Sequence, residues 1–143
     1  MAKLKPAPLP TKKYTKASDA LRAARDLIRN KNRWTTGDLA VKYRDNETHR
    51  CTTKSKDAVA FCALGAVKRV NGPAEKAAIA FLRAAGLHLR AQLASGESKV
   101  FYTPEPPYTV GDQDIFSIND DYGHEYVLRM FSRAIRQAKK AGK

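Results

Sequence analysis

The sequence predicts a mainly α-helical fold, a single compact domain of four to five helices with a proline-rich irregular segment or short strands before the last helix. The chain has 143 residues, of which 43% are hydrophobic, so it can form one core but is too short for two ordinary domains. Its apolar residues are rich in alanine, which favours close helix packing over a β-sandwich. Apolar residues also recur at helical spacing in several stretches.

Residues 1–17 are predicted to form a flexible basic arm, and residues 18–143 the single helical domain. Pro6, Pro8 and Pro10 interrupt the arm and favour an extended, solvated backbone. The arm contains lysines and no carboxylate. These lysines are Lys3, Lys5, Lys12, Lys13 and Lys16.

A first helix is predicted over residues 18–31, with Ser18 as its N-cap. Its apolar residues recur at helical spacing. They are Ala20, Leu21, Ala24, Leu27 and Ile28. Residues 32–54 are polar and rich in turn-forming residues, so the sequence predicts a loop there, with a brief strand or a turn of helix.

The central helix is predicted to begin after an N-cap at Ser55 and to end near Asn71-Gly72. Its residues are apolar on nearly every side, which is typical of a helix in the middle of a domain. A third helix is predicted to begin at Pro73 and to stop at Gly86.

A short fourth helix is predicted over residues 87–99. Residues 100–118 mix prolines with β-branched and aromatic residues, which is typical of a long loop or two short edge strands. The last helix is predicted over residues 122–139, with Asn119-Asp120 as its cap. One face of this helix is apolar and contains Val127, Leu128, Phe131, Ala134, Ile135 and Ala138.

Basic residues gather at the two ends of the chain. Residues 1–17 and 126–143 together carry eleven lysines and arginines and no Asp or Glu. Residues 100–125 have the opposite pattern, six Asp and Glu and no lysine or arginine. Because clustered basic side chains displace condensed counterions from phosphate backbones, the basic ends predict a polyanionic partner.

Two predicted helices add a basic stripe each, with basic residues three or four positions apart. Arginine predominates in both stripes, and its planar fork suits bidentate contact with phosphate. The predicted nucleic-acid-binding residues are Lys12, Lys13, Lys16, Arg22, Arg25, Arg29, Arg129, Arg133, Arg136 and Lys140. The aromatic residues that could stack on exposed bases are Tyr14, Trp34 and Tyr43, of which Trp34 is expected in the core.

Several short motifs follow one another in an order that resembles a known family. They are Trp34, the stretch Phe61-Cys62-Ala63-Leu64-Gly65-Ala66, the pair Asn119-Asp120, and the closing helix with Val127, Leu128, Phe131, Arg133, Ala134 and Ile135. The order resembles a family of small, mainly helical bacterial and phage proteins classed only as a domain of unknown function, over roughly residues 18–138. The resemblance implies a helical fold and a bacterial or phage setting, and it implies no activity. The lysine-rich arm lies outside it, so polyanion binding would be a property of this member.

The two thiols are expected to differ. Cys62 lies within an apolar helix and is expected to pack in the core, whereas Cys51 lies beside His49 and Arg50, a neighbourhood that favours a thiolate. None of the cysteines and histidines has the spacing of a zinc motif.

Aspartates before the last helix raise a second metal hypothesis. Asp112, Asp114, Asp120 and Asp121 suit a hard cation such as Mg²⁺, and beside a nucleic acid they would fit a metal-dependent nuclease. The same residues are expected more simply as helix caps and first-turn charges. No metal site and no cofactor is therefore predicted.

Together these patterns predict a non-enzymatic nucleic-acid-binding protein, accessory or regulatory, of bacterial or phage origin. It would contact DNA or RNA mostly through the backbone, with weak sequence specificity. The alternatives are a protein-interaction module that binds an acidic protein, and the nuclease. No apolar run reaches the roughly 20 residues that span a bilayer, and the N-terminus lacks the apolar stretch of a secretory signal, so the bacterial cytoplasm without a membrane partner is the expected location.

Overall fold

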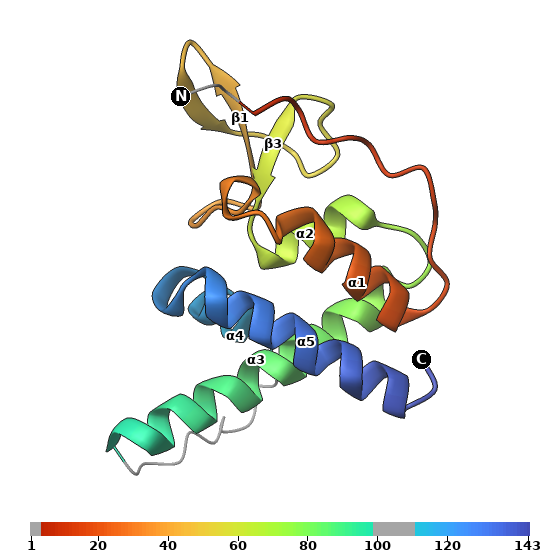
Figure 1. The fold of residues 1–143 in the computed structure, drawn as a ribbon, viewed down its shortest axis with the longest axis vertical. Helices are drawn as coiled ribbons and strands as arrows, with labels where there is room; N and C mark the ends of the chain where they lie inside the picture. Colours follow the sequence, from red (N-terminus) through yellow and green to blue (C-terminus); the bar gives the residue numbers. More distant parts are fainter. Residues whose placement is uncertain (1–3, 99–110) are drawn as a thin grey trace.

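A computed structural model of the chain describes residues 4–98 and 111–143 (Figure 1). The elements in chain order are α1 (Ala17–Ile28), the 3₁₀ helix η1 (Lys31–Arg33), β1 (Ala40–Arg44), β2 (Glu47–Arg50), β3 (Ala58–Phe61), α2 (Ala63–Val70), α3 (Glu75–Ser98), α4 (Asp112–Ser117), the π-helix η2 (Ile118–Tyr122) and α5 (His124–Lys140). The predicted single helical domain is confirmed in its helices, but the described residues also contain a three-stranded sheet, so the fold is mixed α/β.

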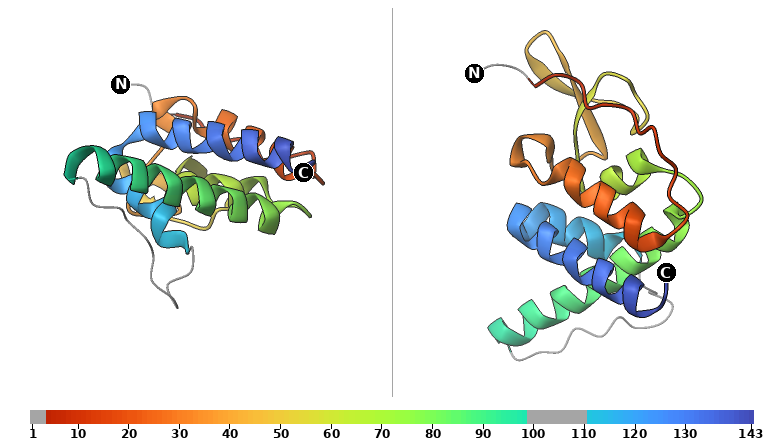
Figure 2. Two further views of the ribbon diagram at one scale, coloured as in Figure 1. Left: turned by 90° about the horizontal axis from the view of Figure 1, so that it is seen from below. Right: turned by 45° about the vertical axis from the view of Figure 1, so that its right-hand side comes forward.

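The helices pack around one apolar core, in which α1 and α5 lie side by side (Figures 1 and 2). The apolar faces predicted for these helices are buried, with Leu21 and Ile28 of α1 and Val127 and Phe131 of α5 fully enclosed. Leu128, expected on the same face, is only partly buried. No helix in the described part of the chain is long and apolar enough to cross a membrane.

The sheet lies beyond one end of the helical layer and has the order β2-β1-β3, with antiparallel pairing throughout (Figure 1). Arg44 pairs with Glu47, which leaves Asp45 and Asn46 as a two-residue turn. Both turn residues have positive φ, 52° and 69°, as a type I′ hairpin turn requires. This pair was a hairpin signal within the segment that was predicted as a loop with a brief strand.

The predicted start of the central helix after Ser55 is wrong, because residues 58–61 form β3 and α2 begins only at Ala63. The Ser55 hydroxyl instead accepts the Asp57 N–H at 3.2 Å, within a turn. All four residues of β3 are buried. A strand that is buried on both faces is continuously apolar and cannot be distinguished from a buried helix by its periodicity.

The predicted stop at Gly86 is also wrong, since α3 continues through it and joins the third and fourth predicted helices. A Cβ at Gly86 would lie 3.1 Å from the Asp114 carbonyl oxygen and 3.2 Å from Met130 Sδ. The glycine therefore permits the close approach of α4 and α5 to α3. Of the predicted loop or strands over residues 100–118, residues 100–110 lie outside the described part, and residues 112–117 form α4.

The N-caps of α1 and α5 are not the residues predicted, and neither makes a side-chain capping hydrogen bond. The N-cap of α1 is Lys16, and Ser18 lies in the first turn of that helix. The N-cap of α5 is Gly123, whose φ of 99° suits a residue without a side chain. Asn119 and Asp120 lie one turn earlier, in the π-helix η2.

Residues 4–16, assigned from the sequence to a flexible arm, lie against the domain. The Ala7 N–H donates to the Ala58 carbonyl at 2.8 Å, and Arg69 Nη2 donates to the Ala7 carbonyl at 2.8 Å. Further along, the Ala74 N–H donates to the Tyr14 carbonyl at 3.2 Å. These contacts fix the segment at two points and carry its lysines to the start of α1.

Candidate nucleic-acid interface

The two basic ends of the chain meet in the structure. The Ser18 N–H donates to the Lys143 carbonyl at 3.2 Å. This hydrogen bond holds the start of α1 against residues 141–143, which follow α5. In Figures 1 and 2 the C-terminus accordingly lies beside the first turn of α1. Six exposed lysines therefore come from both ends to one end of the helix pair, and we call them the lysine cluster. They are Lys12, Lys13, Lys16, Lys139, Lys140 and Lys143.

The arginines of α1 lie on the side of that helix which begins with Ser18. Arg22, Arg25 and Arg29 follow Ser18 at steps of four, three and four residues, so the four residues share one side. Ser18 contacts Lys143, which follows α5, so the first turn of this side lies beside the end of the chain, whereas Arg29 at its other end is exposed. Arg29 forms an ion pair with Asp26 at 2.9 Å, so it is already partly neutralised.

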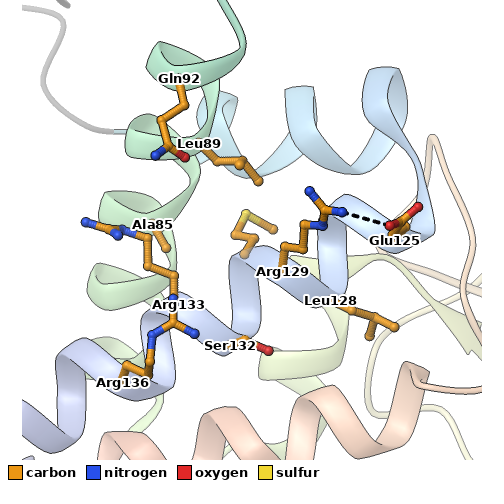
Figure 3. Close-up of a pocket in the computed structure, with 10 residues that line it drawn as sticks. Ala85, Leu89, Gln92, Glu125, Leu128, Arg129, Ser132, Arg133 and Arg136 are labelled. Atoms are coloured by element: carbon orange, nitrogen blue, oxygen red, sulfur yellow. Dashed lines mark hydrogen bonds and ion pairs between the residues drawn. The ribbon is translucent and has the colours of Figure 1, made fainter. Parts of the chain in front are cut away.

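The arginines of α5 border a groove between α5 and α3, with a volume of about 490 Å³ (Figure 3). Arg129 is turned toward Glu125 and binds it at 2.9 Å. Arg133 reaches toward α3 (Figure 3). The pKa of His88 on α3 is lowered mainly by the burial of His88 and in addition by the positive charge of Arg133. Arg136 lies one turn further along, before the lysine cluster.

Among the described residues, no Asp or Glu side chain forms an ion pair with the lysine cluster, Arg133 or Arg136. The α5 stripe runs along the helix into the lysine cluster, and of these residues only Arg129 has a described carboxylate partner; we call them together the positive strip. Of the aromatic residues considered for base stacking, Tyr14 lies near it, with Lys12 Nζ 5.5 Å from its ring centroid, whereas Tyr43 belongs to β1 in the sheet.

The aspartates considered as a cation site are held apart by separate partners. Asp112 pairs with Arg83 at 2.8 Å, and the buried Asp114 pairs with Arg90 at 2.6 Å. These two pairs tie α4 to α3. Asp121 accepts the Ser117 hydroxyl at 3.3 Å. Within residues 4–98 and 111–143, no three His, Cys, Asp or Glu residues are grouped as metal ligands.

The thiols are both less acidic than free cysteine. Cys62 is 2% exposed, and burial raises its pKa to about 11. Its Sγ accepts the Gly65 N–H at 3.3 Å, so Cys62 is the N-cap of α2 in addition to a core residue. Burial also raises the pKa of Cys51, although Lys42 opposes the shift, so the predicted thiolate-favouring neighbourhood is wrong.

Asn119 joins three of the motifs that carried the resemblance, and sequence reasoning assigned it only a capping role. It is fully buried, and its Oδ1 accepts Trp34 Nε1–H at 2.7 Å and the Ala63 N–H at 2.9 Å. Its Nδ2 donates to the Thr35 carbonyl at 3.0 Å. The neighbouring Asp120 accepts the Gly37 N–H at 3.2 Å. These three motifs therefore build the interior of the domain, whereas the fourth motif, in the closing helix, includes Arg133 of the positive strip.

Fold and site together define a small mixed α/β domain with a motif-built core and a basic helical surface. The model of a family of unknown function, DUF6197, matches residues 12–137, and the chain belongs to this family. This match confirms the resemblance and covers Trp34, the Cys62-Ala63 junction and Asn119. It also begins at residue 12, so Lys12, Lys13 and Lys16 lie within the family region, and the expectation that the whole basic arm lies outside it is wrong. No curated protein and no solved structure matches the chain.

Proposed function

We propose that this chain is a non-enzymatic nucleic-acid-binding protein, with an accessory or regulatory role in the cytoplasm of a bacterial or phage-infected cell. The lysine cluster, Arg133 and Arg136 would contact the phosphates, with the α1 stripe at the border. The observation that supports this most is the Ser18–Lys143 hydrogen bond, because it brings two basic segments from opposite ends of the chain to one surface.

The dimensions of this surface suit a phosphate backbone. The 17 residues of α5 extend over about 25 Å, which is the length of several phosphates along one strand. Exposed lysines act as point charges and carry no base preference, and arginine forks bind phosphate oxygens bidentately. Binding of this kind is governed by counterion release, so it depends strongly on salt and weakly on sequence.

The nuclease alternative gains no support from the aspartates. A cation bound by Asp112 or Asp114 would have to compete with Arg83 or Arg90, which already neutralise these carboxylates. Asp120 and Asp121 are engaged with Gly37 and Ser117. Helix packing accounts for the acidic residues without a catalytic role.

Neutralising two lysines of the cluster should weaken binding without regard to sequence. In Lys139→Gln/Lys140→Gln we expect the slope of log affinity against log salt on duplex DNA to become less steep by about 1.8. Each lost phosphate contact removes about 0.9 from the magnitude of this slope. Fluorescence anisotropy with two duplexes of unrelated sequence measures this change, and the affinity for both duplexes should decrease by the same factor.

The matched control is Arg44→Gln/Lys54→Gln, which removes the same charge from two exposed residues in or beside the sheet, away from α5 (Figure 1). It should leave the slope almost unchanged. If the control lowered affinity and slope as much as the cluster variant, binding would follow net charge alone, and the surface assigned above would be incorrect.

A further inference from the structure

The groove between α3 and α5 has an apolar floor that phosphate binding does not explain. Leu89 of α3 and Leu128 and Met130 of α5 line it, together with Ala85 (Figure 3). Leu89 and Leu128 are partly exposed within it. Phosphates gain nothing from contact with leucine side chains, so the floor suits a ligand that buries apolar groups of its own.

The rim of the same groove is positive. Arg133 and Arg136 have no carboxylate partner among the described residues, while Arg129 is held by Glu125. Arg133 and Arg136 are three residues apart, which is just under one helical turn or about 4.5 Å along α5. A ligand that fits this groove therefore combines apolar side chains with carboxylates about one turn apart.

We infer that the groove between α3 and α5 binds an acidic amphipathic helix of a partner protein. The apolar face of such a helix would cover Leu89 and Leu128, the two partly exposed residues of the floor, and its flanking Glu or Asp side chains would pair with Arg133 and Arg136. Amphipathic helices bind apolar grooves with anchors three, four and seven residues apart, and carboxylates three or four residues apart on such a helix share one side, as Arg133 and Arg136 do on α5. The inference goes beyond nucleic-acid binding and does not depend on it.

An unstacked base of a single strand is the competing occupant. Protein sites for bases stack them on aromatic side chains, and the described residues that line the groove include none. Its apolar part is aliphatic or methionine, and the remaining lining residues are polar or charged, with arginine the most frequent, so the groove favours a peptide.

The test uses a fluorescein-labelled synthetic helix of about 18 residues, long enough to be partly helical alone, with leucines on one face and glutamates on both flanks. Two matched peptides carry glutamine in place of glutamate, or the same residues in scrambled order. Full-length protein should bind the acidic amphipathic peptide about tenfold more tightly than either matched peptide.

Leu128→Gln separates the groove from the phosphate surface. It removes apolar floor and keeps every charge, so we expect peptide affinity to fall about tenfold while duplex affinity and its salt slope stay unchanged. Leu9→Gln is the control, because Leu9 is 53% exposed on the N-terminal segment and outside the groove. Circular dichroism and thermal unfolding of both variants check that the fold is retained.

Three results would overturn the inference. The scrambled peptide could bind as tightly as the amphipathic one, or Leu128→Gln could leave peptide affinity unchanged. Alternatively, Leu128→Gln could lower the affinity for a single-stranded oligonucleotide and leave the affinity for the peptide unchanged, which would assign the groove to bases. None of these outcomes affects duplex binding by the lysine cluster, so the two proposals fail separately.

Discussion

Replacing Asn119 with Ala should lower the free energy of unfolding by about 3 to 5 kcal/mol, because each buried polar group left without a partner costs about 1 to 3 kcal/mol. The variant would leave Trp34 Nε1–H, the Ala63 N–H and the Thr35 carbonyl without their partner. Urea unfolding measures the loss. Trp34 is the single tryptophan, so its fluorescence reports directly on this contact.

Asp120→Ala is the matched control for this prediction. Asp120 is exposed and accepts the Gly37 N–H and Asn119 Nδ2–H, but Asn119 Nδ2 keeps its bond to the Thr35 carbonyl, so the loss of Asp120 should cost only about 1 kcal/mol, as for a typical helix or turn cap. Equal losses for Asn119→Ala and Asp120→Ala would show that Asn119 does not have the structural role derived from its hydrogen bonds.

Replacing Gly65 with Ala should destabilise the protein by about 3 kcal/mol or more, the upper range for overpacking a core. A Cβ at Gly65 would overlap the Leu39 carbonyl oxygen, which is backbone and cannot rotate away. The same carbonyl accepts the Cys62 N–H at 3.2 Å, so a shift of the chain at Leu39 would also disturb the start of α2. Thermal unfolding measures this effect.

Gly86→Ala tests whether the effect at Gly65 is specific. Its Cβ would lie 3.1 Å or more from neighbouring atoms, a tight contact rather than an overlap. Alanine also favours the helix by about 1 kcal/mol relative to glycine. We therefore expect a much smaller loss, and a Gly65→Ala protein as stable as Gly86→Ala would contradict the packing of α2 against Leu39.

The elements predicted well are those whose pattern is local. The apolar face of α5 repeats over 17 residues with the opposite stripe basic, and this contrast fixes both its helical state and its buried side. The same holds for α1. Two elements were predicted wrongly because their structure depends on residues distant in the sequence. β3 is a strand because it pairs with β1, and Gly86 lies inside α3 because α4 and α5 approach it there.

The candidate site was predicted only in part. Spacing alone placed Arg133 and Arg136 on one side of a helix, but no local pattern could show that the two ends of the chain meet. That meeting depends on the packing of α1 against α5 and on the contact of Ser18 with Lys143. The motif Asn119-Asp120 was found in the sequence, yet its interior role required partners about 85 residues away.

The salt dependence of duplex binding by the unmodified protein tests the central proposal most directly. Affinity is measured by anisotropy for two duplexes of unrelated sequence, between about 50 and 200 mM salt. About six phosphate contacts predict a slope of log affinity against log salt near −5, equal for both duplexes. Affinity that does not change with salt, or no binding at the lowest salt, would contradict the assignment of the lysine cluster and the α5 stripe to a nucleic-acid backbone.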